Sequence, residues 1–351
     1  MTIISAVVGL SALVVIHELG HMLAAKTVGV KVTEFGFGFG PPLLRKKIGK
    51  TTYSIRIILL GGFVKMAGMN DEEKGPESYR SKGAWRRAFI ILAGPFANLL
   101  AAVLILATLY VSGVPTGVTT EVEDVIPGSL AAEAGMQGGD RIVAVDGEEV
   151  ESWRQFQEIM RKKQPGDKVE LVVERNEERD RFSGMLTADP EDSEKAIVGV
   201  RPIVITTSYG PLEALGLGVE RTIEIIGIFG TFIGQLVTGE VSFYDSVSSP
   251  IGIVEVSSDV ASQGVQSFAQ LLALISINLA IFNLLPILPL DGGHLFFIAG
   301  EKILGRPVSA ETVGKFAAFG LALILMMFVL ATYADLSKIF TGQPFIPEVG
   351  P

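Results

Sequence analysis

Two histidines and a glutamate stand close together near the start of this 351-residue chain, in a run that is otherwise apolar. His17 and His21 are four residues apart, and Glu18 directly follows the first. On a helix, positions i and i+4 share a face, so both imidazoles can bind one metal ion. Glu18 can then reach a water at that metal as a general base. The pattern predicts a hydrolytic metal site; a pair of structural histidines inside a helix bundle is the alternative.

The remaining ligands for a metal are few. The chain has no cysteine and only three histidines, the third being His294. Any zinc must therefore be held by imidazole and carboxylate, which suits a catalytic site better than a structural one. Asp291 follows an apolar segment broken by Pro286 and Pro289, where a carboxylate is costly unless it binds a cation. We predict Asp291 as the third ligand, with a helix cap as the alternative role.

The composition is that of an integral membrane protein. Hydrophobic residues make up 48% of the chain, charged residues 19%, and the mean hydropathy is +0.45. Apolar runs near spanning length occur at 2–25, 88–113, 268–290 and 316–333. The first run has no basic start, and cleavage near Ala24 would discard the histidine motif. We therefore expect a retained membrane helix and not a signal peptide.

The stretch from Lys26 to Arg87 is basic, with 13 Lys and Arg. By the positive-inside rule this loop should be cytoplasmic and the N-terminus outside. Its segments 35–40 and 53–66 are rich in aromatic and β-branched residues and are bounded by Gly and Pro, which predicts strands. Such a sheet beside the membrane could pair its edge with an extended substrate. A hairpin that only adds stability is the alternative.

The second predicted span carries Gly94-Pro95, which favours the close approach of a neighbouring helix. Asn98 lies one turn further on. It could line a cavity, but we favour a simple hydrogen bond between helices.

The acidity of the chain is confined to one insert. Residues 113–211 hold 20 Asp and Glu against 11 Lys and Arg, whereas the rest of the chain has 18 of each. Nothing in this pattern indicates a nucleic-acid partner. The run from Pro127 to Gly147, with Pro-Gly-Ser-Leu-Ala-Ala followed by Gly-Asp-Arg-Ile and Val-Asp-Gly, resembles a PDZ domain of the circularly permuted bacterial type. The resemblance implies a peptide groove between a strand and a helix at 152–163.

Two further segments follow the insert. Residues 211–239 are apolar but contain Glu213, Glu220, Arg221 and Glu224, which favours an amphipathic surface helix over a span. Residues 242–262 are polar and predict a connector.

Together these motifs resemble the site-2 protease family of intramembrane zinc metalloproteases, most closely the bacterial sigma-E regulator protease type. The residues that carry the resemblance are His17-Glu18-Leu19-Gly20-His21, Gly61-Gly62-Phe63-Val64-Lys65-Met66, Asn283-Leu284-Leu285-Pro286 and Leu290-Asp291-Gly292-Gly293. That group often has two PDZ domains, and this chain has one, which bears on substrate gating more than on chemistry.

The resemblance implies a role for each matching residue. His17, His21 and Asp291 would bind Zn²⁺, and Glu18 would be the catalytic acid and base. Asn283, with Pro286 beside it, would hold the substrate backbone, and Gly61, Gly62 and Phe63 would belong to a β element that dips into the membrane. No role follows for His294, which could be a fourth ligand or support the ligands, although we favour a packed or interfacial histidine.

The sequence thus predicts a polytopic α-helical membrane protein with about four transmembrane helices, a membrane-associated β element and an inserted α/β PDZ domain. We expect a catalytic half at 1–112, an extracytoplasmic PDZ domain at 113–205, an amphipathic helix and connector at 206–262, and a second catalytic half at 263–351. The expected place is the bacterial inner membrane. The expected partners are the lipid bilayer and single-span substrates such as anti-sigma factors or remnant signal peptides. The PDZ domain would bind substrate peptide or restrict access.

Three other functions remain open on the sequence. The chain could be a membrane scaffold without catalysis that recruits partners through the PDZ-like insert. It could be a transporter with an ion site at Asp291 and Asn283, although no internal repeat supports this. It could also be a conventional metalloprotease that acts on soluble substrates.

Overall fold

The computed structural model describes residues 2–69, 73, 75–189, 192, 194–241, 252, 260, 264–306 and 308–341. Most of the predicted connector at 242–262 lies outside these residues. The described chain forms two compact units, one made of Met1–Val111 and Gly210–Pro351 and the other of Ser112–Tyr209. The predicted insert at 113–205 lies within the second unit. Each unit is described separately below.

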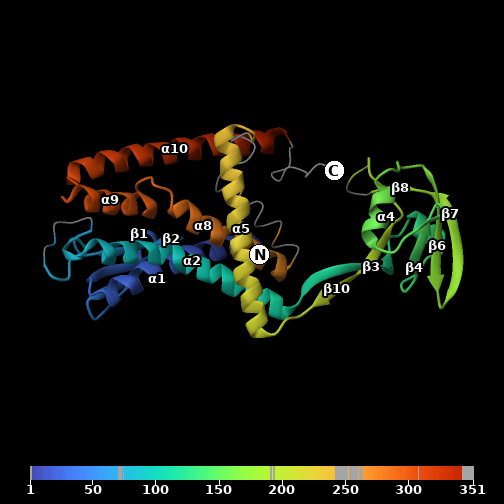
Figure 1. Cartoon of the computed structure of the whole chain (residues 1–351), viewed down its shortest axis with the longest axis horizontal. Coiled ribbons are helices and arrows are strands. Elements are labelled where there is room, and N and C mark those ends of the chain that lie inside the picture. Colours follow the sequence, from blue (N-terminus) through green and yellow to red (C-terminus); the bar gives the residue numbers. More distant parts are fainter. Residues whose placement is uncertain are drawn as a thin grey trace. The chain divides into compact units, whose positions relative to one another are not determined.

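The first unit consists of long helices and one small sheet (Figure 1). Its elements are α1 (Thr2–Thr27), β1 (Val32–Ile48), β2 (Thr51–Met66), the short 3-10 helix η1 (Tyr79–Ser81), α2 (Ala84–Ser112), α5 (Pro211–Thr238), α8 (Val265–Asn283), α9 (Asp291–Leu304) and α10 (Ala310–Thr341).

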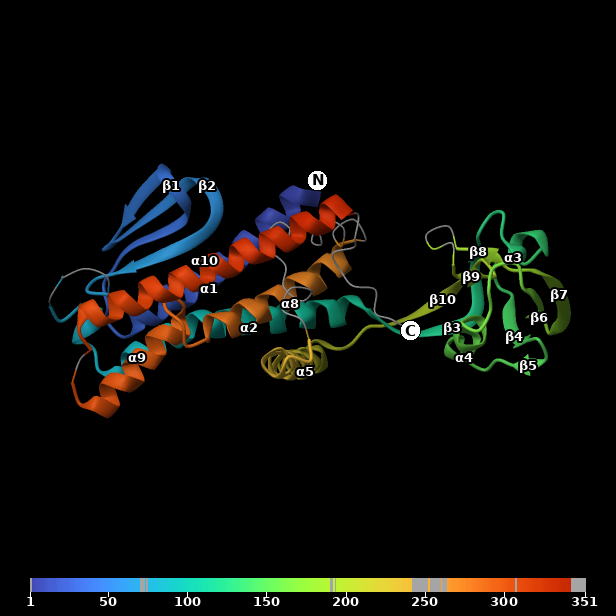
Figure 2. The same cartoon turned by 90° about the horizontal axis from the view of Figure 1, so that it is seen from above.

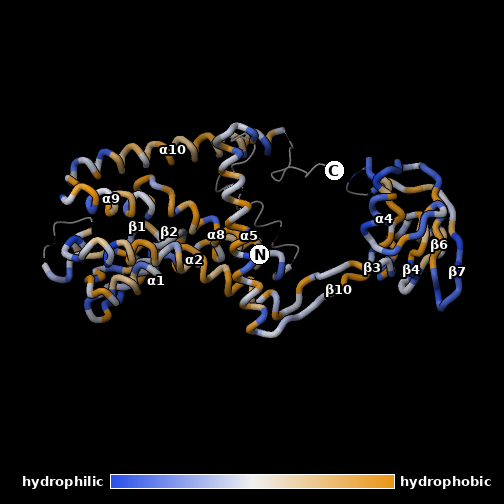
Figure 3. The backbone as a smooth tube through the Cα atoms, in the orientation of Figure 1, coloured by the Kyte–Doolittle hydropathy of each residue, from blue (hydrophilic) through white to orange (hydrophobic). Residues whose placement is uncertain are grey.

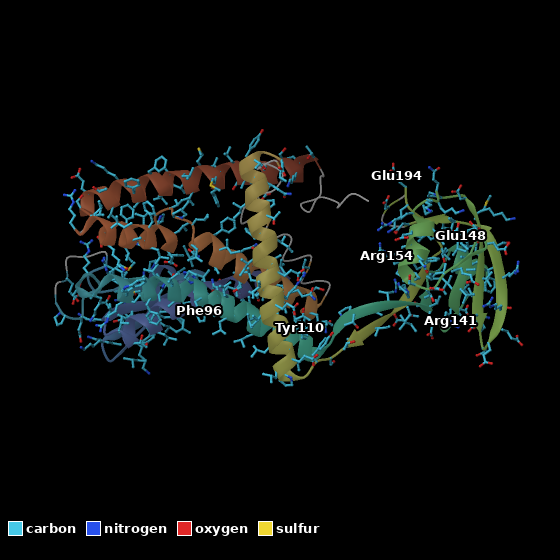
Figure 4. The ribbon with its side chains drawn as sticks, viewed as in Figure 1. Phe96, Tyr110, Arg141, Glu148, Arg154 and Glu194 are labelled. Carbon is cyan, nitrogen blue, oxygen red and sulfur yellow. The ribbon has the colours of Figure 1, made fainter. Side chains whose placement is uncertain are left out.

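Among the described residues, four helices are long and apolar enough to cross a membrane. They comprise Ile4–Thr27, Ala84–Ser112, Val265–Asn283 and Glu311–Lys338. Hydrophobic residues predominate along these helices (Figure 3). Their outer surfaces carry apolar side chains such as Phe96 on α2, which is 65% exposed and suited to contact with lipid (Figure 4). The number of spans agrees with the sequence prediction.

The third span predicted from the sequence extends beyond the end of the observed helix. The sequence placed it at 268–290, but α8 ends at Asn283 and α9 begins at Asp291. Pro286 and Pro289 cannot continue a helical hydrogen-bond ladder, so the chain turns between the two helices. This break places Asp291 in the first turn of a new helix.

α5 differs from the spanning helices in direction as well as in composition. It runs across α2 and α8 in Figure 1 and is seen nearly end-on in Figure 2. A proline at its start and a left-handed Gly239 at its end delimit it. Gly218 permits close packing, because a Cβ there would lie 2.8 Å from the Val103 carbonyl oxygen of α2.

The two strands β1 and β2 bend back so that they form four paired segments. Residues 32–37 pair with 62–66 on one side and with 51–55 on the other, and 42–48 complete the sheet beside 51–56. The segment 61–66 is therefore an edge of the sheet. Val32 and Met66 are buried in a core shared with α1, α2 and α9, which holds this edge against the helices.

The second unit is a small α/β domain. Its elements are β3 (Val114–Val125), α3 (Leu130–Glu133), β4 (Arg141–Val145), β5 (Glu148–Glu149), α4 (Trp153–Met160), β6 (Lys168–Arg175), β7 (Glu178–Met185), β8 (Thr187–Ala188), β9 (Ala196–Ile197) and β10 (Val200–Thr207). The main sheet has the order β10-β3-β4-β6-β7, and β5 pairs with β4.

Local sequence explains both helices of this unit. Ser129 caps α3, and Ser152 forms a reciprocal capping box with Gln155 at the start of α4. Alternate residues of β6, namely Val169, Leu171 and Val173, are fully buried in the core. Charged side chains such as Arg141 and Glu148 project outward (Figure 4). The unit thus has a hydrophobic core of its own.

Candidate active site

The two predicted histidine ligands lie on one face of α1, as their spacing requires. His17 and His21 are 6% and 5% exposed. Their Nε2 atoms are 3.2 Å apart. Nδ1 of His21 donates a hydrogen bond to the Ile90 carbonyl oxygen at 2.8 Å. Because a carbonyl can only accept, this bond places the proton of a neutral imidazole on Nδ1 and leaves a lone pair on Nε2.

Asp291 reaches the histidines from the other end of the chain. Its Oδ2 lies 3.0 Å from Nε2 of His17 and 3.2 Å from Nε2 of His21. The turn before α9 is tight enough to require the two following glycines. A Cβ at Gly292 would lie 2.1 Å from the Leu284 carbonyl oxygen, and one at Gly293 would lie 2.5 Å from the Leu288 nitrogen. The Asp-Gly-Gly sequence therefore serves the geometry that delivers the carboxylate.

These three atoms form the group in the described chain that is suited to hold a metal ion. They are mutually 3.0–3.2 Å apart. Ligands at the usual zinc distances, arranged tetrahedrally, are about 3.3 Å apart. Oδ2 of Asp291 is buried and accepts no hydrogen bond from the described residues. The Nε2 lone pair of His21, the unpartnered Oδ2 of Asp291 and Nε2 of His17 thus converge on one point where a cation could be bound. The residues fit a zinc ion with a position left for water.

Gly94 of α2 provides the space in front of the histidines. A Cβ at this position would lie 2.3 Å from Nε2 of His21 and 2.8 Å from Nε2 of His17. The sequence predicted close helix approach at Gly94, and α1 and α2 do meet here, because a Cβ at Gly20 would lie 2.2 Å from the Ala93 carbonyl oxygen. The additional function of Gly94, keeping the ligand atoms uncovered, was not predicted.

Glu18 lies beside the edge of the small sheet. The backbone amide of Val64 is close enough to its carboxylate to interact with it. Gly62 is in contact range, since a Cβ built there would be 3.5 Å from Cγ of Glu18. The edge segment 61–66 therefore lies next to the candidate base, which directly follows the candidate metal ligand His17 in the chain.

The other predicted substrate residues are not all gathered at this point. The Phe63 ring covers Gly36, where a Cβ would approach it to 2.3 Å, and it lies 4.7 Å below the guanidinium of Arg56. Gly61 has a φ of +79°, which favours glycine, and faces Phe39. Through these contacts, Gly61 and Phe63 contribute to the packing of the sheet.

Asn283 donates its amide to the Leu279 carbonyl oxygen of its own helix at 2.9 Å. Pro286 is exposed in the turn that follows. His294 lies one turn beyond Asp291 on α9, half-buried, and is not part of the three-residue metal group. The substrate roles of Asn283 and Pro286 therefore remain predictions.

Sequence reasoning did not identify one group at the site, the Ile90 carbonyl, and did not identify the partner of another, Asn98. The Ile90 carbonyl oxygen is a backbone atom, so no residue type could reveal it. Asn98 was assigned a bond between helices, and it does make one, but its partner is His17: Nδ2 of Asn98 lies 3.3 Å from Nδ1 of His17. The spacing Ile90, Gly94, Asn98 is four residues throughout, which is the one signal that could have identified this face of α2.

Comparison with known proteins agrees with this geometry. Residues 5–327 match peptidase family M50. The chain belongs to that family. Among its relatives is the zinc metalloprotease RasP of Shouchella clausii, 31% identical, with 97% of this chain and all of the relative covered. The regulator of sigma-W protease RasP of Bacillus subtilis is 28% identical over 97% and 99% of the two chains. A provisionally named zinc metalloprotease of Agrobacterium fabrum is 33% identical over 96% of each.

The M50 assignment confirms the predicted resemblance to site-2 proteases and makes the protein a membrane metalloprotease. It supports a metalloprotease over a scaffold without catalysis or a transporter. Solved structures with some similarity include the PDZ domain of an SdrC-like protein from Listeria monocytogenes, at 25% identity and a TM-score of 0.22, covering 25% of this chain and 87% of that one. The corresponding domain from Listeria innocua also has 25% identity and a TM-score of 0.22, with coverage of 24% and 92%.

Proposed function

We propose that this M50 peptidase is an intramembrane zinc protease that cleaves transmembrane segments of other proteins. The observation that carries the proposal is the convergence of His17, His21 and Asp291 at mutual distances of 3.0–3.2 Å. Both histidines lie on α1, a helix of spanning length, and Asp291 begins α9 shortly after the spanning-length helix α8. Two imidazoles and a carboxylate are the ligand set of many catalytic zinc sites.

In this proposal each residue has one task. His17, His21 and Asp291 would hold Zn²⁺, which when bound would lower the pKa of a water and polarise the scissile carbonyl. Glu18 takes a proton from the attacking water and later delivers it to the nitrogen of the leaving amine. The Val64 amide, which lies close to the Glu18 carboxylate, would help to orient it. The burial of both histidines excludes bulk water from the ligands.

The edge segment 61–66 supplies a way to bind the substrate. A helical segment has its amides bonded internally, so a protease must first extend it. The outer edge of this segment can bond an extended peptide as an added strand, and Gly62 places that edge next to Glu18. Asn283 and Pro286, at the break between α8 and α9, would hold the substrate backbone from the other side after the Asn283 amide leaves the Leu279 carbonyl.

The relative from Bacillus subtilis is named as a regulator of sigma-W protease. By analogy we propose single-span membrane proteins as substrates, with anti-sigma factors and remnant signal peptides as the two classes. The 13 Lys and Arg between Lys26 and Arg87 favour a cytoplasmic position for this loop. The PDZ-like insert would then be extracytoplasmic, where it binds substrate peptide or limits the size of what enters.

The test is to measure the zinc content of the purified protein and its cleavage of a single-span substrate, for wild type and for Glu18→Gln. We expect about one zinc per chain in both and cleavage by wild type alone, since the variant keeps all three ligands but loses the base. Mapping the cut separates the two kinds of protease. A cut inside the span supports the proposal, whereas cuts only in soluble segments, or activity retained by Glu18→Gln, contradict it.

A further inference from the structure

Helix α2 contacts both candidate zinc ligands of α1 through a single stripe of residues. His21 contacts Ile90, both histidines face Gly94, and His17 contacts Asn98. These contacts run in opposite directions along the two helices, so α1 and α2 are antiparallel here. Because each step on α2 is four residues, the three groups lie on one face.

The two histidines differ in what holds them. His21 is held by a backbone carbonyl, which fixes its Nδ1 as the donor. His17 is held by the side chain of Asn98, which is fully buried. An imidazole that binds zinc through Nε2 carries its proton on Nδ1 and needs an acceptor there. Asn98 must therefore turn its carbonyl oxygen, and not its NH₂ group, toward His17 when the metal is bound.

The surroundings of Asn98 permit that orientation. Its Oδ1 is buried and has no hydrogen-bond partner among the described residues, so a half-turn of the amide breaks no bond at that end. Its backbone carbonyl accepts a 2.8 Å hydrogen bond from the Ser276 hydroxyl of α8, and Ser276 is also fully buried. This bond ties the Asn98 backbone to a third helix, the one that carries Asn283.

We propose that Asn98 is a positioning residue for the metal site: its amide oxygen accepts the Nδ1–H of His17, and it thereby fixes the ring and its tautomer for zinc. This inference rests on the proposed zinc site and adds to it a supporting residue on α2. Removal of such partners typically lowers metal affinity by about 10- to 100-fold.

The experiment compares zinc affinity in detergent-solubilised wild type, Asn98→Ala and Asn98→Asp by competition with a chelator. Aspartate can only accept, so it should keep zinc affinity within about threefold of wild type, while alanine should lose about 10- to 100-fold. Asn278→Ala is the matched control, because Oδ1 of Asn278 on α8 is also buried and unpartnered within the described chain; it should bind zinc like wild type.

Each outcome decides the inference. Equal zinc affinity in Asn98→Ala and wild type overturns it and leaves the zinc protease intact. Zinc missing from folded wild type overturns the proposed function and this inference together. If Asn98→Ala does not fold, Asn98→Asp still decides, because a tenfold loss of affinity in that variant contradicts the acceptor role.

Discussion

Two aspartates with little exposed surface, Asp140 and Asp291, show how differently the two regions treat a carboxylate. In the PDZ-like unit, Asp140 is 1% exposed, and both of its carboxylate oxygens accept hydrogen bonds. Arg175 bonds both of its oxygens at 2.6 and 2.8 Å, and the Gln137 amide bonds Oδ2 at 2.9 Å. In the helical unit, Asp291 points Oδ2 at the Nε2 atoms of two histidines, and Oδ2 accepts no hydrogen bond within the described residues. The first carboxylate is paired with donors of its own domain, whereas the second is left for the cation that we propose.

This difference separates a structural charge from a functional one. A buried ion pair with all its hydrogen bonds made contributes to the shape of its domain and requires nothing further. Hydrogen-bond acceptors that point at one another repel, so such an arrangement is unfavourable unless it binds a cation. The two aspartate side chains are 1% and 13% exposed, and the chemical nature of the neighbouring atoms separates them more clearly than burial does.

The largest expected effect comes from Asp291→Asn. The neutral amide is a poor zinc ligand, so we expect zinc to be lost and cleavage to fall to background, a drop of at least about 1,000-fold. The matching Asp140→Asn variant should keep its zinc. Metal analysis and a cleavage assay on both variants test the comparison directly. Loss of zinc from Asp140→Asn would show that the insert supports the site after all.

A smaller effect is expected on the stability of the insert. Asp140→Asn weakens the bonds to Arg175 and to the Gln137 amide around a buried group, at a cost of about 2 kcal/mol in the free energy of unfolding of that unit. Asp291→Asn should leave the insert unchanged. Hydrogen exchange of the β4 and β6 amides in the full chain measures this. Faster exchange in the Asp291 variant would contradict the independence of the two regions.

The pH dependence of the insert should follow from the same residue. The Arg175 guanidinium, bonded to Asp140, holds the pKa of that carboxyl below its ordinary value. Its stabilisation is therefore fully present above the unfolded-state pKa of about 3.9 and is lost as the pH falls through the lower folded-state pKa. Wild type and Asp140→Asn should differ in exchange at pH 6 and converge once the pH falls below the lowered folded-state pKa. A difference that persists at low pH would assign the effect to something other than this charge.

The smallest effect is expected at an exposed pair. Arg154 and Glu158 form an i,i+4 ion pair on α4 at 3.0 Å, and the Arg154 side chain is 89% exposed (Figure 4). Such pairs are screened by water and salt. Arg154→Ala should leave both the exchange of the insert and the zinc content within experimental error of wild type. A clear change in either would mean that α4 takes part in something beyond its own domain.

Much of the fold was predictable because it depends on patterns local in sequence. The apolar runs identified the spans, and the capping residues Ser129 and Ser152 mark the helices of the insert. The end of the third span was wrong by seven residues, about two helical turns, because hydropathy continues through Leu290 whereas the hydrogen-bond ladder stops before Pro286. Hydropathy shows which segments are apolar, but the backbone geometry decides where a helix ends.

The sequence by itself determined the ligand types, since His17 and His21 meet on any helix and Asp291 is the acidic residue at a break in an apolar segment. Only the tertiary structure decided that these three atoms lie 3.0–3.2 Å apart and that α2 surrounds them with Ile90, Gly94 and Asn98. Residue spacing fixes relations within one helix. Distances between α1, α2 and α9 depend on packing among residues up to 274 positions apart, such as His17 and Asp291, and no local pattern encodes that packing.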